Sequence, residues 1–426
     1  MNKKQVLRTL FALTATTLLW TGCSDNGTLT PPDETPKVPI EPETATISFN
    51  LGIPTGDEVD FAKDRAAGEV LQDGTEWTLK TLKVYHFKKG AEESNGDTDY
   101  KLVNAYKIPV LESGDPASGL CVKTDDAKYS LRLSLRTALD GTHAFAFVAN
   151  DSCSTFDENL VLEGTTLVDL KKCVADKQLA TDKKDASLFM GDPAGLCMTC
   201  ILDNQTLQAG ENTSQDVKLT RIMARLDIRN FVPENRNFQL KSLKVTYTNT
   251  VGATKGYLFQ NVNDAGGLTI ASGGSNIWTN PQVMEVTQNP IYEGKYTTYA
   301  KADAEMRDSW ISICSDNNRT GVWYKKVLYM YEFPKTINGI STAAPMAEIA
   351  YTLNGSPSTV EVPMKETRAD GSAVLIDIKR NHLYTLQIGE TSAQGGPIVF
   401  SFTDTPWSIH EMDADLNEGT NSDKVD

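Results

Sequence analysis

The chain has 426 residues, with 41 basic and 56 acidic side chains and a formal net charge of -15 at pH 7. This charge argues against nucleic acid or an anionic membrane surface as a partner, because both repel an acidic protein. The four histidines leave little material for an imidazole metal centre. At ~100 to 200 residues per domain, the length predicts two or three domains.

The chain begins with the pattern of a bacterial lipoprotein signal peptide, residues 1–22. Basic residues precede an apolar stretch, residues 10–20, that is too short to span a bilayer as a helix, and small residues then run directly into Cys23. We therefore expect cleavage before Cys23 and attachment of acyl chains such as palmitate to it. An ordinary secretory signal with an incidental cysteine is the alternative.

A polar tether follows and leads into the first predicted strand. Residues 24–43 are rich in proline, threonine and acidic side chains, a composition that favours extended, solvated chain. Apolar and polar residues then alternate strictly over residues 47–53, which predicts a strand with one buried face.

The next segment, residues 55–68, is a polar and acidic loop that contains glycine and a single arginine, Arg65, followed by Ala66. Such loops are where proteases cut. After a cut here, the preceding strand would no longer be covalently held. Its sheet could then lose the strand and expose an apolar groove with unpaired backbone.

The rest of the chain reads as short strands separated by turn residues, which predicts an all-β protein with two antiparallel β-sandwich domains. A change of parity near Thr220 predicts a bulge there. Short helices are expected only at 160–170 and 300–308. The expected strands are 77–87, 129–135, 143–150, 217–228, 239–247, 325–333, 348–353, 358–363, 382–388 and 398–402.

A polar, proline-containing turn near residues 227–237 predicts the boundary between the two domains. The expected units are an N-terminal domain at 66–226, a C-terminal domain at 227–396 and a terminal segment at 397–426. That last segment alternates apolar residues after a glycine-rich hinge and ends in an acidic tail. A removable strand at one end and a hinged strand at the other are the two halves of a strand-exchange polymer.

Motifs for catalysis are missing from the sequence: it contains no GxGxxG, GxxxxGK[ST], HExxH or GxSxG. We therefore expect no enzyme, no cofactor and no metal. The histidines at 86, 143 and 382 lie in strand patterns and are expected to pack. A CxxC at residues 197–200 lacks a second pair of zinc ligands, and disulfides and buried thiols both stay open. The cysteines concerned are Cys121, Cys153, Cys173, Cys197, Cys200 and Cys314.

Taken in order along the chain, several short pieces resemble the fimbrillins of Bacteroidales, most closely the Mfa-type subunit of the short fimbriae. The pieces are the signal ending at Cys23, the junction of Arg65 and Ala66, and residues 219–225, 379–384 and 406–410. The resemblance implies two transthyretin-like β-sandwich domains in a lipoprotein exported to the outer membrane, exposed at the cell surface. It further implies a structural fimbrial subunit, a pilin, that supports adhesion.

The resemblance also implies a route of assembly by donor-strand exchange. An arginine-specific protease would cut between Arg65 and Ala66, and the lipid would leave with the propeptide. The placeholder strand that departs would carry Ile47, Phe49, Leu51 and Ile53. The donor segment of an identical or related subunit would then dock Ile398, Phe400, Phe402, Trp407 and Ile409. A host or bacterial receptor is a further expected partner.

Three alternatives stay open. The acidic tail, residues 413–426, extends beyond the usual ending of the family, which fits a tip or anchor subunit as well as a stalk subunit. An anchor would keep its lipid and need no cut at Arg65. A monomeric surface lipoprotein could instead bind a glycan through Trp310 and Trp323. A hydrolase with paired acidic residues has only the abundance of acids behind it.

Overall fold

The structure is a computed structural model that describes part of the chain, and strands make up most of what it describes. One α-helix, α1 (Leu167–Lys171), and two 3-10 turns, Asp97–Asp99 and Glu234–Arg236, accompany them in this part. The predicted all-β class is confirmed. The described residues are 43–53, 78–90, 96–151, 160–175, 196–246, 256–262, 268–274, 283–286, 311–316, 319–334, 336–337, 340–341, 345–367, 373–375, 377–391 and 396–406.

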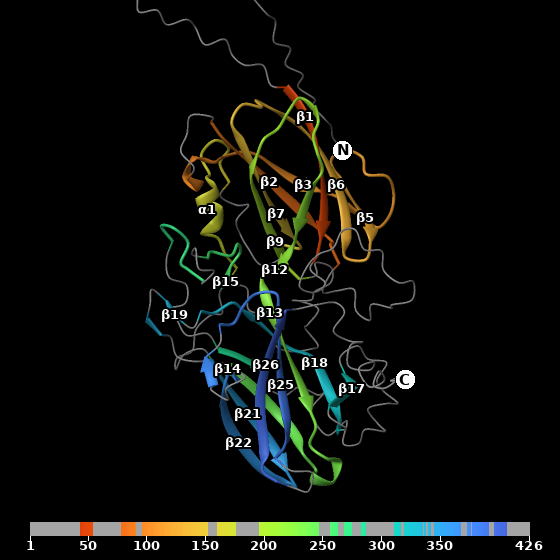
Figure 1. Ribbon diagram of the computed structural model, residues 1–426, viewed down its shortest axis with the longest axis vertical. Coiled ribbons are helices and arrows are strands. Elements are labelled where there is room, and N and C mark those ends of the chain that lie inside the picture. The colour runs from red at the N-terminus through yellow and green to blue at the C-terminus, as the bar shows by residue number, and fades with distance from the viewer. Residues whose placement is uncertain are drawn as a thin grey trace, which may run out of the picture. The chain divides into compact units, whose positions relative to one another are not determined.

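Two sheets are built from the strands that precede residue 222 (Figure 1). The first has the order β10-β1-β6-β5-β4, and β11 also pairs with β1. Its strands are β1 (Glu43–Gly52), β4 (Val110–Leu111), β5 (Leu120–Asp125), β6 (Lys128–Thr137), β10 (Gly210–Glu211) and β11 (Gln215–Lys218). The second has the order β12-β9-β7-β2-β3. Its strands are β2 (Leu82–Lys89), β3 (Lys101–Ile108), β7 (Thr142–Ala149), β9 (Met198–Gln205) and β12 (Thr220–Arg221).

The strands after residue 222 form a second pair of sheets. One has the order β17-β18-β13-β25-β26, from β13 (Met223–Asn230), β17 (Ile311–Asp316), β18 (Arg319–Tyr331), β25 (His382–Glu390) and β26 (Ile398–Pro406). The other has the order β16-β14-β21-β22, from β14 (Gln239–Thr246), β16 (Val283–Val286), β21 (Met346–Leu353) and β22 (Ser356–Pro363). Short pairs complete the fold: β8 (Val174–Ala175) with β15 (Gly256–Tyr257), β19 (Thr336–Ile337) with β20 (Ile340–Ser341), and β23 (Lys365–Thr367) with β24 (Ala373–Leu375).

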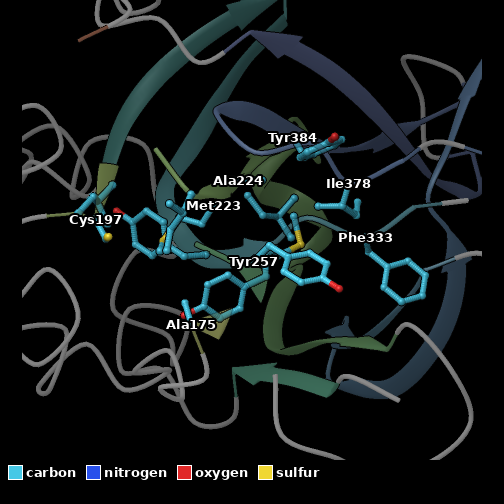
Figure 2. Packing of buried hydrophobic residues seen from close by; sticks show 14 of the residues in the cluster. Ala175, Cys197, Met223, Ala224, Tyr257, Phe333, Ile378 and Tyr384 are labelled. Atoms are coloured by element: carbon cyan, nitrogen blue, oxygen red, sulfur yellow. The ribbon is translucent and has the colours of Figure 1, made fainter. Parts of the chain in front are cut away.

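Two clusters of buried apolar side chains hold these sheets together. The first core lies between the first two sheets and takes its side chains mainly from β1, β6, β2 and β7. The second core combines the other face of the second sheet and α1 with the inner faces of the later two sheets. Figure 2 shows part of the second core, with Cys197, Met223, Tyr257 and Tyr384 among its members. Each pair of sheets is thus a sandwich around buried side chains.

The expected strand at residues 217–228 is three strands, β11, β12 and β13, so the prediction of one strand with a bulge is wrong. Val217 and Leu219 belong to the first core, whereas Ile222 and Ala224 belong to the second. The change of parity in the sequence records this passage from one core to the other. All of β13 pairs with later strands, β18 and β25. The division of the chain into domains at residue 226 stays a prediction.

Most other expected strands are present with shifted ends. The strand expected at 143–150 is β7, and its residues from His143 to Ala149 are all buried, so both of its faces are covered. The expected helix at 160–170 shrinks to α1, which starts at a capping box between Thr166 and Asp169. In the part of the chain that the structure describes, no helix has the length and apolar character that a membrane span requires.

Candidate strand-exchange site

The first strand, β1, occupies the interior of its sheet rather than an edge. Along one side it pairs antiparallel with β6 over its whole length, from Glu43 opposite Thr137 to Gly52 opposite Lys128. Along the other side it pairs parallel with β10 and β11. Removing β1 would therefore leave two rows of backbone groups without partners, one on β6 and one on β10 and β11.

The buried face of β1 follows from its alternating sequence. In a strand, successive side chains point to opposite faces, so every second residue meets the core. The predicted burial of this face is confirmed, since the side chains of Ala45, Ile47, Phe49, Leu51 and Ile53 are each at most 1% exposed. The role of this strand as a removable placeholder stays a prediction.

Phe49 makes aromatic contacts with two residues of the second sheet. Its ring meets Phe145 edge-on, with ring centroids 5.1 Å apart and the planes at 63°. It meets Phe147 in the same way, at 5.1 Å and 74°. Edge-to-face contacts of this kind add to the free energy gained from burial alone. An aromatic ring is therefore the side chain that fits this position best.

Polar contacts tie the rest of β1 to its neighbours. The backbone N–H of Asn212 donates to the carbonyl of Thr46 at 2.8 Å, and that of Leu219 donates to the carbonyl of Gly52 at 2.8 Å. The Asn50 side chain donates to the carboxylate of Asp216 at 2.9 Å. These groups lie on the side of β10 and β11. The polar backbone groups of Thr46 and Gly52 consequently point away from β6.

The free energy of burial and hydrogen bonding that holds β1 in its sheet determines how the strand could leave. Four large side chains, those of Ile47, Phe49, Leu51 and Ile53, are fully buried. Burial of each contributes roughly 1.5 to 3 kcal/mol, to which the two ladders of hydrogen bonds add. A cut in the chain alone would not release a strand held this firmly. A competing strand with matching side chains is needed to displace it.

The predicted donor segment is docked in its own sheet. β26 pairs antiparallel with β25, from His382 opposite Pro406 to Glu390 opposite Ile398. Phe402 is buried, and Ile398 and Phe400 pack against the second core. Phe400 also lies beside Tyr351, with ring centroids 5.8 Å apart. These three side chains would have to leave the second core before they could dock elsewhere.

Several predicted positions lie outside the described residues. They are Cys23, Arg65, Ala66, Trp407 and Ile409, together with the signal peptide, the tether, the helix expected at 300–308 and the acidic tail. The structure describes the residues on either side of the segment that carries Arg65. These residues are Ile53 before it and Thr78 after it, next to the buried Leu79.

Two of the sequence motifs behind the resemblance meet in the structure, which sequence reasoning did not foresee. Arg221, from the 219–225 motif, donates from its guanidinium to the side-chain oxygen of Asn381 at 2.7 Å. The backbone N–H of Asn381 donates to the carbonyl of Met223 at 2.8 Å. Asn381 has a positive φ of 56°, a conformation that asparagine tolerates well. These contacts fix the start of β13 against the start of β25.

Arg380, next to Asn381, forms a buried ion pair with Glu332. Its Nε and Nη2 donate to the two carboxylate oxygens at 2.8 and 2.5 Å. Nη2 also donates to the carbonyl of Tyr257 at 2.7 Å, and Nη1 to that of Leu258 at 3.1 Å. The 379–384 motif therefore serves to join elements of the second core.

The cysteines of the CxxC motif form no disulfide and lie in different places. Cys197 belongs to the second core, whereas Cys200 packs against the first. Residues three apart in extended chain point to opposite faces, which separates the two sulfur atoms. Cys121 and Cys173 form no disulfide either. Among the described residues, no group of three or more histidine, cysteine or acidic side chains is placed to hold a metal ion.

Comparisons with known proteins give loose matches. No protein-family model matches the chain, and no curated protein matches it. The tip fimbrial protein Mfa3 from Porphyromonas gingivalis with C-terminal truncation has 12% identity and a TM-score of 0.46, over 85% of this chain and 100% of that one. A fimbrial assembly protein from Parabacteroides distasonis has 14% identity and a TM-score of 0.43, over 85% and 97%. At these scores the likeness assigns no function.

Proposed function

We propose that the chain is a structural subunit of cell-surface fimbriae that polymerises by exchange of strands. The observation that carries the proposal is the position of β1, which is paired along both sides and whose buried face fills the first core. We call the groove that β1 occupies, between β6 on one side and β10 and β11 on the other, the seat of β1. In the sequence, β1 is joined to the following strands through residues 54–77, the segment that contains Arg65. A single cut in this segment breaks the covalent link between β1 and the later strands, and β1 then stays in place only through its non-covalent contacts.

The precursor is exported as an outer-membrane lipoprotein with its lipid on Cys23. An arginine-specific protease cuts between Arg65 and Ala66, so that the lipid, the tether and β1 form one fragment. The C-terminal segment of a second copy then replaces β1 and regains the buried contacts and both ladders of hydrogen bonds. The donor thus regains the contacts that β1 loses, and the contacts that β26 gives up in its own sheet are the free-energy cost that the exchange has to meet.

The experiment compares the parent chain with Arg65→Ala, each treated with an arginine-specific protease. The parent chain is expected to yield a mature N-terminus at Ala66 and to form fibres visible by electron microscopy. The variant is expected to remain a folded monomer that keeps residues 23–65. Lys63→Ala, two residues away in the same segment, is the matched control and should behave like the parent. Normal fibres from Arg65→Ala would contradict the proposal.

A second candidate, a tip or anchor subunit, is favoured by one observation. β26 is paired with β25 over nine residues, and its inward side chains pack against the second core. A subunit that receives a strand but donates none would keep this arrangement. Removing residues 407–426 leaves β26 intact and tests whether the residues beyond β26 are needed for fibres. Tethering β26 covalently to β25 tests whether β26 has to leave its own sheet to act as the donor. Fibres from the tethered chain but not from the truncated chain would favour a stalk subunit whose donor is residues 407–426.

A further inference from the structure

The buried face of β1 has a counterpart at the other end of the chain. Along β1 the inward residues are Ala45, Ile47, Phe49 and Leu51, and the buried Ile53 follows just beyond the end of the strand. Around the start of β26, residues at the same spacing are Gly396, Ile398, Phe400 and Phe402. Both sets run from a small residue through isoleucine and phenylalanine to a second large apolar residue.

We infer that the seat of β1 in one copy accepts residues 396–402 of a second copy in one register, with Phe400 in the place of Phe49. This inference rests on the proposed function and adds to it which residue of the donor enters which position. In this register Ile398 takes the place of Ile47, and Phe402 takes the place of Leu51. The donor runs in the same direction as β1, antiparallel to β6.

A shift of the donor by two residues in one direction is unfavourable at both ends of the seat. It would place Ile398 where Ala45 lies, and this methyl group is fully buried with no exposed surface to expand into. Overfilling a packed site typically costs about 1 to 3 kcal/mol. The same shift would put the carboxylate of Asp404 in the place of Leu51, which is also fully buried, and an unpaired buried charge is more costly still.

A shift in the opposite direction leaves the central pocket underfilled. Ile398 would then stand between Phe145 and Phe147, where the ring of Phe49 makes two edge-on contacts. Gly396 would take the place of Ile47, which leaves a cavity in the first core. Such losses of buried volume typically cost about 2 to 5 kcal/mol. The register that places Phe400 between the two rings avoids both the overfilling at Ala45 and the cavity at Ile47. In this register Asp404 would fall at Ile53, which is buried just beyond the end of β1, so the docked part of the donor has to end before residue 404.

The outward face of the donor is compatible with the same register. Pro397 would replace Thr46, whose carbonyl accepts from the backbone N–H of Asn212. Proline keeps its carbonyl but lacks an N–H, so that only the donor half of this position is lost. Val399 and Ser401 would replace Ser48 and Asn50. These residues face away from the core both in β26, where they are exposed, and in the proposed seat.

Disulfides between a cysteine on β6 and a cysteine on the donor report the register directly. Asn50 lies opposite Ser130, and the backbone groups of even-numbered β1 residues point away from β6. Such pairs bring Cα atoms to about 4.5 Å, within the range that a disulfide spans. Each test chain carries Ser130→Cys with one donor substitution, Val399→Cys, Ser401→Cys or Thr403→Cys. Asn50→Cys with Ser130→Cys is the control, which should link within the uncut chain.

After protease treatment, assembly and mild oxidation, we expect Ser401→Cys to give disulfide-linked dimers on a non-reducing gel. The other two donor substitutions should give none above the background of the parent chain. Dimers through Thr403→Cys or Val399→Cys in place of Ser401→Cys would overturn the register. Fibres without any link, while the control links, would place the donor elsewhere and leave the proposed function standing. Failure of the cut parent chain to form fibres would overturn the proposed function itself, and this inference with it.

Discussion

His86 Nε2 and His143 Nδ1 lie 3.0 Å apart in the interior of the second sheet. Their rings stack at 5.2 Å, and the ring of His86 also stacks on Phe145 at 4.8 Å. Burial, assisted by the charges of His143 and Lys88, lowers the pKa of His86 to about 3. Burial and Lys88 lower the pKa of His143 to about 4, although the carbonyl of Leu139 and the carboxylate of Asp140 act in the opposite direction. Both imidazoles are thus neutral at pH 7.

This pair predicts a loss of stability in weak acid. In the unfolded chain a histidine has a pKa near 6.5, so it takes up a proton below this pH, whereas the buried rings do not. The contribution is fully present above pH ~6.5 and declines as the pH falls toward the lowered values. Each ring accounts for about 2 kcal/mol between pH 7.5 and pH 5.

Urea denaturation at several pH values between 7.5 and 5 measures this effect. His143→Gln should flatten the decline, because one proton-binding site disappears from the unfolded state. Ser48→Ala, on the half-buried outer face of β1, removes no titratable group and is the control that should follow the parent curve. Identical declines in the parent and in His143→Gln would show that the pair is not responsible.

A second prediction concerns the seat of β1. Phe49→Ala in the uncut chain should lower the free energy of unfolding by about 3 to 5 kcal/mol, because it removes a ring held between Phe145 and Phe147. Ser48→Ala, on the opposite face of the same strand, should change it by less than about 0.5 kcal/mol. Chemical denaturation compares the two. Equal effects from both substitutions would mean that β1 is not seated as described.

A third prediction concerns Asn150, which fixes the chain just beyond the segment that carries Arg65. Its side-chain oxygen accepts from the N–H groups of Lys80 and Thr81 at 2.8 and 3.2 Å, and its amide donates to the carbonyls of Thr78 and Leu196 at 2.8 and 3.1 Å. Asn150 also has a positive φ of 53°.

Asn150→Ala should cost about 2 to 4 kcal/mol, since buried backbone groups lose partners and alanine disfavours this φ. Asn150→Gly relieves the backbone cost alone and should recover a part of it, which separates the two causes. Hydrogen exchange should show faster exchange at Lys80 and Thr81 in both variants. Unchanged exchange at these two amides would contradict the assigned bonds.

The sequence predicted the strands well where a single face is buried, as in β1 and β6, because a period of two is a local property of the chain. It did not predict the partners of β1 on the parallel side. The strands β10 and β11 are short and mostly polar, and Gly210 and Glu211 are exposed, so this stretch has no clear alternation of apolar and polar residues. Their pairing is set by β1, and no local pattern reports it.

The contacts of charged residues were equally hidden. Arg221 and Asn381 are separated by 160 positions, and nothing in either motif names the other as its partner. The pairing of β26 with β25 was also not predicted, because an alternating strand after a hinge has the same sequence pattern whether it pairs within its own chain or with a second copy. In each case the missing information is which distant surface the side chain meets.

The last prediction concerns the ion pair of Arg380 and Glu332, whose side chains are 3% and 1% exposed. Arg380→Leu removes the charge opposite a buried carboxylate and the donors to two carbonyls, those of Tyr257 and Leu258. The expected loss in the free energy of unfolding is about 3 to 5 kcal/mol.

Two further variants separate the causes. Replacing both partners, with Arg380→Leu and Glu332→Leu, should recover the part that comes from the uncompensated charge but not the part due to the two carbonyls. Arg132→Ala is the matched surface control, because its pair with Glu211 is largely exposed and should contribute at most about 1 kcal/mol. Urea denaturation at pH 7 compares the three chains. An Arg380→Leu variant no less stable than Arg132→Ala would show that the buried pair does not hold the second core together.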